Sequence, residues 1–199
     1  MDNAATTTVG MIGGGQLCMM MAEAVHHKQL PVKIIALDAS PRCPAHNVVD
    51  ELIVGSVKDP GKIREVARKS DVLTYETETT EGSILRELHR EGMVIHPSPD
   101  TLATIQDKLL QARYLSEHGI AVPAFLAVEG HTSFEEGIDR FGLPLMIKAR
   151  RDSYDGRGNF VLRDVQEIDE VLSTFKGRKL MIQQFIPFEK EVSVIAARS

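Results

Sequence analysis

Short apolar runs and amphipathic segments alternate along the first half of the chain. Five runs are mostly apolar and predict buried strands: 8–12, 32–37, 52–54, 72–75 and 93–95. Helices are predicted between them, over 16–27, after Asp59-Pro60 and over 84–90. In the first of these helices one face carries four apolar residues: Leu17, Met20, Met21 and Ala24. Apolar strands that alternate with helices predict an α/β domain over residues 1–97, with a doubly wound parallel sheet.

The pattern changes after the stiff segment His96-Pro97-Ser98-Pro99. A helix is predicted over 101–119. Short strands then alternate with helices over 133–141 and 165–174, and the predicted strands are 125–128, 145–148, 160–162, 180–184 and 192–197. This mixture predicts an α+β module over residues 98–199 with a mixed or antiparallel sheet. The chain stops directly after the last predicted strand, which favours an incomplete chain.

Composition excludes several classes of protein. The 199 residues are 43% hydrophobic, which is too apolar for a disordered chain, yet no apolar run approaches the roughly 18 residues of a membrane span. The net charge of -5 argues against a nucleic-acid partner. Cys18 and Cys43 cannot form a disulfide framework, and no Cys/His spacing suits zinc. Because the N-terminus also lacks a secretory signal, we expect a cytoplasmic location.

A glycine turn follows the first predicted strand. Gly13-x-Gly15-x-x-Cys18 is a near match to a dinucleotide-binding fingerprint, and Asp38 ends the next strand. Backbone N–H groups at the start of the following helix could hold a phosphate. A tight turn without a ligand is the alternative. Ligands of parallel sheets bind at the carboxyl ends of the strands, and Glu76 follows the fourth strand there. Its carboxylate could accept hydrogen bonds from an amine or from sugar hydroxyls.

A basic loop follows the predicted strand over 145–148. Lys148 ends this strand, and the loop that follows it adds three arginines and two glycines: Arg150, Arg151, Gly156, Arg157 and Gly158. In a chain of negative net charge, this excess favours a flexible loop that closes over a triphosphate. A solvated basic hairpin is the alternative. Further on, Pro187 interrupts the segment 183–188, which predicts either a hinge that binds a base edge or a plain hairpin.

Taken in order, these segments resemble the ATP-grasp enzymes of purine biosynthesis. They are most similar to the 5-(carboxyamino)imidazole ribonucleotide synthetase family. The sequences of segments 96–99 and 158–161 resemble those of the fungal-type phosphoribosylaminoimidazole carboxylases, in which this synthetase is the N-terminal part of a longer chain. The matching segments span nearly the whole sequence: 9–17, 73–78, 105–108, 147–150, 154–160 and 191–193.

The resemblance implies an activity and a set of site residues. ATP would phosphorylate bicarbonate to carboxyphosphate, whose carboxyl group passes to 5-aminoimidazole ribonucleotide. The implied ATP contacts are Lys108, Lys148, Ser153, Tyr154, Asp155, Gly156, Arg157, Gly158, Asn159, Gln183, Gln184, Phe185, Ile186 and Glu191. Contacts to the ribonucleotide map onto Gln16, Leu17, Glu76, Tyr154, Asp155 and Arg157. Of these, Asp155 and Arg157 are the implied catalytic residues.

The resemblance also implies parts beyond residue 199. The Mg²⁺-binding carboxylates and a C-terminal ATP-grasp domain would lie there, so this chain alone is expected to be inactive. It allows a homodimer in the intact enzyme. Three departures stand out: Cys18-Met19 replaces Gly-Arg, Asp152-Ser153 replaces two glycines, and Gln183 replaces Glu. An NAD-type oxidoreductase domain and a non-catalytic nucleotide-binding module are the alternative functions.

Overall fold

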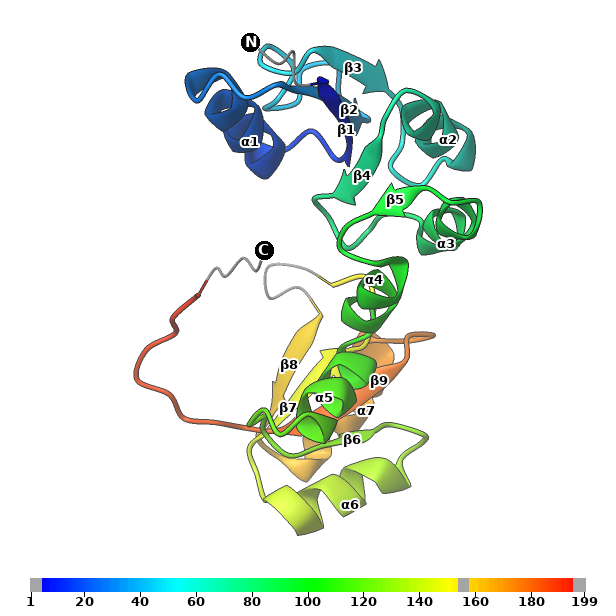
Figure 1. Ribbon diagram of the computed structural model, residues 1–199. Helices are drawn as coiled ribbons and strands as arrows, with labels where there is room; N and C mark the ends of the chain where they lie inside the picture. Colours follow the sequence, from blue (N-terminus) through cyan, green and yellow to red (C-terminus); the bar gives the residue numbers. More distant parts are fainter. Residues whose placement is uncertain (1–4, 154–157, 195–199) are drawn as a thin grey trace. The chain divides into compact units, whose positions relative to one another are not determined.

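The computed structural model describes residues 5–153 and 158–194 (Figure 1). The chain forms two compact units, residues 1–106 and 107–199. The sequence had led us to expect a boundary after residue 97. The helix α4 (Pro99–Ile105) falls instead within the first unit, where it packs against α3 (Gly82–Arg90). No helix in the described residues is long and apolar enough to cross a membrane.

The first unit contains a five-stranded parallel sheet in the order β3-β2-β1-β4-β5. Its strands are β1 (Thr7–Ile12), β2 (Val32–Asp38), β3 (Glu51–Val54), β4 (Val72–Tyr75) and β5 (Val94–Ile95). Besides α3 and α4 it has α1 (Gln16–His27) and α2 (Pro60–Arg68). The chain runs outward from β1 through β2 to β3 and then returns to the other side of β1 with β4. The doubly wound parallel sheet predicted from the sequence is therefore confirmed.

Alternate residues of the central strands pack on opposite faces of this sheet. On one face Ile12, Ile35 and Leu37 join the core made with α2, α3 and α4. On the other face Met11 and Ile34 pack with α1. The two faces are thus each covered, as expected for strands that are apolar throughout.

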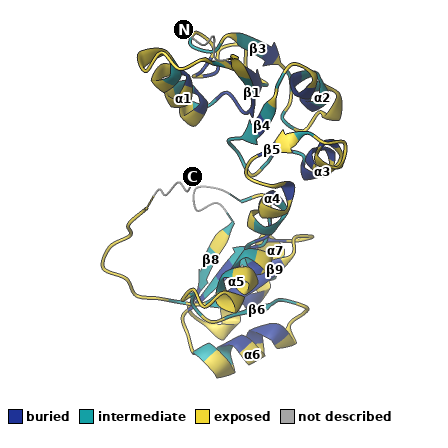
Figure 2. Cartoon of the chain, viewed as in Figure 1, coloured by how far each residue is buried: buried dark blue, intermediate teal, exposed yellow. Residues whose placement is uncertain are grey.

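Helix α1 turns a different side to the sheet than its apolar stripe suggests. The small residues Cys18 and Ala22 are buried against the sheet, whereas Leu17, Met20 and Met21 are 45–58% exposed (Figure 2). Met19 and Val25 are partly buried and pack against the same cluster, so α1 meets the sheet through two small side chains and two larger ones. The expected departure at Cys18 therefore does not prevent close packing.

The second unit contains a four-stranded antiparallel sheet in the order β6-β9-β7-β8. Its strands are β6 (Phe125–Ala127), β7 (Leu145–Ala149), β8 (Asn159–Leu162) and β9 (Leu180–Gln184). Helices α6 (Thr132–Phe141) and α7 (Ile168–Thr174) cover one face, and α7 follows a short 3₁₀ turn over Val165–Glu167. Helix α5 (Lys108–Glu117) packs on the other face. This confirms the predicted α+β module.

Two predictions in the second half were wrong. The single helix over 101–119 is two helices, because Asp107 is extended (φ -121°, ψ 108°) and caps α5 with its side chain. The strand predicted over 192–197 is absent at Val192–Val194, which have no regular secondary structure, and its residues 195–197 lie outside the described residues. Val192 and Val194 are 83% and 88% exposed and pair with no strand in the described residues. Alternation alone cannot form a strand without a neighbour to accept its hydrogen bonds.

Candidate functional site

A cleft of about 430 Å³ lies at the carboxyl ends of the parallel strands in the first unit. It opens where the strand order reverses, between β1 and β4, which is the usual ligand site of such sheets. Three carboxylates line it, from Asp38, Glu76 and Glu78. None of the lysines or arginines that the structure describes lines this cleft. The cleft therefore suits amine or hydroxyl groups of a ligand better than its phosphate.

Glu76 holds the start of α1. Its Oε2 accepts a hydrogen bond from the Gly15 N–H (2.6 Å), and its Oε1 accepts one from the Leu17 N–H (3.0 Å). The Gly14 N–H donates to Asp38 Oδ2 at 3.0 Å. The helix N-terminus thus faces the loop that follows β4, as the sequence predicts. The amides of Gly14, Gly15 and Leu17 already donate to carboxylates, which gives the interpretation of this turn as a phosphate site less support. That interpretation stays a prediction.

Glycine is required in this turn for two reasons. Gly13 has φ +114°, and an added Cβ would lie 2.9 Å from Glu76 Cβ. At Gly15 a side chain would overlap the Glu76 carboxylate. Both glycines therefore let the Glu76 side chain approach the backbone of the turn.

A second cleft, of about 200 Å³, lies in the second unit and is lined by α5, β7 and β9. Lys108 and Gln111 line it from α5, Lys148 from β7, and Met181 and Gln183 from β9. Residue alternation explains this arrangement. Leu145, Ile147 and Ala149 of β7 enter the core under α6 and α7, so Lys148 points to the other face.

Lys148 is suited to bind an anion. Burial lowers the pKa of its ammonium group. Among the described residues it forms no ion pair with a carboxylate. Asn159 stands opposite it on β8. A partly buried cation of this kind gains from an anionic ligand that replaces its lost hydration.

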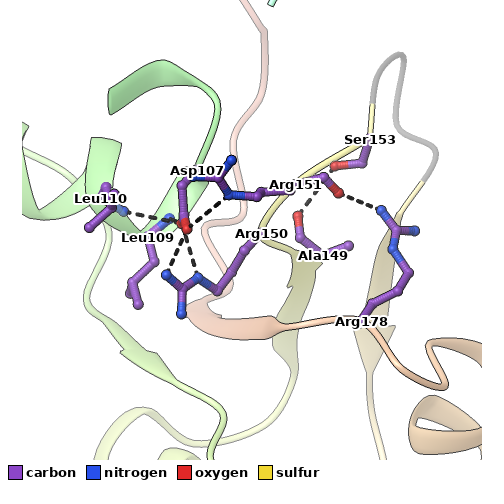
Figure 3. A network of polar contacts seen from close by, with 8 residues as sticks. All are labelled: Asp107, Leu109, Leu110, Ala149, Arg150, Arg151, Ser153 and Arg178. Carbon is purple, nitrogen blue, oxygen red and sulfur yellow. Dashed lines mark hydrogen bonds and ion pairs between the residues drawn. The ribbon is translucent and has the colours of Figure 1, made fainter. Parts of the chain in front are cut away.

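Sequence reasoning missed Asp107, which organises the polar network beside this cleft (Figure 3). Its buried carboxylate accepts two hydrogen bonds from Arg150, from Nε at 2.9 Å and from Nη2 at 2.6 Å. It also accepts the α5 amides of Leu109 (3.0 Å) and Leu110 (3.4 Å). Burial raises the pKa of Asp107, but these donors outweigh burial and leave that pKa lowered. The sequence predicts Arg150 as one of the positive charges of the basic loop. In the structure its guanidinium is instead bound by Asp107.

Comparison with known proteins places both units in a family. Residues 6–106, just over half of the chain, match the ribonucleotide synthetase preATP-grasp domain. The chain belongs to this preATP-grasp family. Residues 113–199 match the ATP-grasp domain. We therefore call residues 1–106 the preATP-grasp unit and residues 107–199 the ATP-grasp unit.

Similar proteins are known from several organisms. A phosphoribosylaminoimidazole carboxylase of Ogataea methanolica is 42% identical over 96% of this chain and 36% of its own length. An N5-carboxyaminoimidazole ribonucleotide synthase of Synechococcus elongatus is 36% identical over 96% of this chain and 48% of its own. The chain thus spans between one third and one half of these relatives.

Solved structures agree with this assignment. N5-carboxyaminoimidazole synthase of Aspergillus clavatus, in complex with ADP and 5-aminoimidazole ribonucleotide, aligns with a TM-score of 0.80 at 29% identity. The alignment covers 92% of this chain and 48% of that one. The synthetase of Staphylococcus aureus with ADP gives a TM-score of 0.83 at 28% identity over 92% of this chain and 48% of that one.

The two units bring some of the expected site residues together and leave others apart. In the preATP-grasp unit, Glu76 and Leu17 line the cleft, and Gln16 is exposed beside it without lining it. In the ATP-grasp unit, Lys108, Lys148 and Gln183 share a cleft. The remaining expected ATP contacts that are described do not line it: Ser153, Gly158, Asn159, Gln184, Phe185, Ile186 and Glu191. Tyr154, Asp155, Gly156 and Arg157 lie outside the described residues.

Local geometry accounts for one departure in the ATP-grasp unit. Asp152 has φ +54°, in the left-handed region that favours glycine. This fits a position where glycine is expected from the resemblance. As for the metal, the described ranges hold no group of three His, Cys, Asp or Glu side chains able to bind an ion.

Proposed function

We propose that this chain carries the ribonucleotide-binding cleft and part of the ATP-binding cleft of a 5-(carboxyamino)imidazole ribonucleotide synthetase, acting in purine biosynthesis. The names of its relatives and the ligands of the Aspergillus structure support this proposal. Two free cysteines fit a reducing, cytoplasmic location.

The reaction joins three small molecules. The γ-phosphoryl group of ATP passes to a bicarbonate oxygen, which releases ADP and forms carboxyphosphate. The exocyclic amine of aminoimidazole ribonucleotide then attacks the carboxyl carbon, the C–O bond to phosphate breaks, and the amine loses a proton. The acidic cleft beside Glu76 suits the amine and ribose hydroxyls of the ribonucleotide. Asp155 and Arg157 remain the catalytic residues that we propose for bicarbonate and for developing negative charge.

The convergence of Lys108, Lys148 and Gln183 carries the proposal. These residues are up to 75 positions apart in sequence, yet they line one cleft of about 200 Å³. Two ammonium groups there would neutralise a polyphosphate, and the amide of Gln183 could bind a base edge. Because the glycine-turn amides of the preATP-grasp unit donate to Asp38 and Glu76, an NAD-type oxidoreductase has less support.

Binding of ATP to the 199-residue chain tests this proposal. Lys148→Met removes the charge but retains most of the apolar stem, and we expect it to weaken ATP binding by about tenfold, or about 1.4 kcal/mol. Lys176→Met is the matched control, because Lys176 is exposed and lies outside the cleft. Titration calorimetry with ATP and Mg²⁺ gives both affinities. Equal affinity in wild type and Lys148→Met would contradict the proposed nucleotide site, and preferential binding of NAD would favour the oxidoreductase.

A further inference from the structure

A buried ion pair ties the beginning of α5 to the end of β7. Asp107 is 3% exposed, and both of its carboxylate oxygens accept from the Arg150 guanidinium. The Lys108 N–H also donates to the Arg150 carbonyl oxygen at 2.9 Å. Side chains and main chain therefore fix the same junction through three hydrogen bonds.

This junction links the two lysines that line the cleft, because each lies within two residues of one member of the ion pair. Lys108 follows Asp107 directly and begins α5. Lys148 precedes Arg150 by two residues on β7, where it pairs with Met181 of β9. A change in the Asp107–Arg150 contact would consequently shift one lysine relative to the other.

The chemistry of the Asp107–Arg150 pair is better suited to fixing the positions of its neighbours than to stabilising the fold. Burying two charges costs hydration, and such a pair adds less stability than its contacts suggest. A guanidinium fork on a carboxylate does, however, fix both distance and orientation. The neighbouring loop is held in the same region, because Arg178 Nη2 donates to the carbonyl oxygen of Arg151 at 2.6 Å (Figure 3). It also donates to the carbonyl oxygen of Asp152 at 3.0 Å.

We infer that Asp107 and Arg150 are positioning residues, which set the spacing of Lys108 and Lys148 for a polyphosphate. The inference rests on the proposed function, because it assumes that these lysines bind the phosphates of ATP. It adds that affinity depends on the fork geometry of the pair and not on its charge alone. A lysine at position 150 would keep the positive charge and lose the fork.

The test compares ATP binding by four variants of the chain with binding by wild type. Arg150→Lys and Arg150→Met should each weaken ATP binding by about tenfold, since small misplacements of binding groups are costly. Asp107→Asn keeps an oxygen for the α5 amides and should weaken binding in the same direction. Arg140→Lys is the matched control, because Arg140 forms an exposed ion pair with Glu136 in the same unit. It should stay within about twofold of wild type.

A second readout separates positioning from stability. In chains with ¹³C-labelled lysine, the side-chain signal of Lys148 without ATP should move in Arg150→Lys and stay in place in Arg140→Lys. If the pair only stabilises the fold, Arg150→Lys should lower the unfolding temperature. Below that temperature, the Lys148 signal and the ATP affinity should then equal those of wild type.

The outcomes distinguish the two proposals. If Lys148→Met binds ATP as well as wild type does, the proposed nucleotide site fails. If Lys148→Met weakens binding but Arg150→Lys does not, with an unmoved Lys148 signal, only the positioning role fails. If Arg150→Met does not fold, Arg150→Lys and Asp107→Asn decide the matter, because each retains a polar group at its position.

Discussion

Replacing Glu76 by Gln should destabilise the preATP-grasp unit as well as alter its cleft. In the wild type the carboxylate accepts N–H groups of Gly15 (2.6 Å) and Leu17 (3.0 Å) at the start of α1. A glutamine amide has one oxygen for these two donors, and its NH₂ group cannot accept from the other. The variant also removes a negative charge from the positive end of the helix dipole.

The magnitude follows from these two losses. One missing cap-type hydrogen bond costs about 1 kcal/mol, and the dipole interaction contributes about another 1 kcal/mol in a partly buried position. Together they predict about 2 kcal/mol, which corresponds to about a thirtyfold increase in the population of the opened unit.

Hydrogen exchange by mass spectrometry locates this effect. Protection of peptides from α1 and from the β1–α1 turn should fall in Glu76→Gln, while peptides from the ATP-grasp unit keep theirs. Glu78→Gln is the matched control, since Glu78 lines the same cleft and its exposed side chain has no hydrogen bond among the described residues. Equal protection of α1 in the two variants would refute the capping role of Glu76, whatever its effect on ligand binding.

Two further predictions concern the core of the preATP-grasp unit. Gly10→Ala should destabilise it by about 1–3 kcal/mol through overpacking, because the new Cβ would lie 2.6 Å from Leu73 and Val66; urea unfolding checks this against Gly130→Ala, which meets open space, and equal stabilities would contradict it. Burial raises the pKa of Cys18 to about 12, so its thiol should resist iodoacetamide at pH 8.5 in the folded chain and react after unfolding. The Cys18 pKa is raised above the value of about 8.5 for an unfolded chain, so above pH 8.5 the unfolded state loses the thiol proton first. The free energy of unfolding should therefore fall as the pH rises above about 8.5, and it should fall less steeply in Cys18→Ala.

Local pattern predicted the sheet of the preATP-grasp unit well, because its strands are mostly apolar and most of its turns carry Gly, Asp or Pro. The same reasoning failed at α1, because its buried face carries Cys18 and Ala22 and not the predicted apolar stripe. It failed again at Gln106–Asp107, since a helical pattern runs through both residues. An extended Asp107 lets its side chain both cap α5 and pair with the distant Arg150.

The clefts show the same division between local and distant causes. The sequence by itself determined that Glu76 follows a strand, that Lys148 ends one, and that glycines precede α1. Only the tertiary structure decided that Glu76 occupies the amides of the glycine turn and that Arg150 is engaged by Asp107. A sequence pattern records what each segment can bury or donate within a few residues. Here the acceptors lie 61 and 43 positions away in the sequence, so these pairings form only when the chain packs.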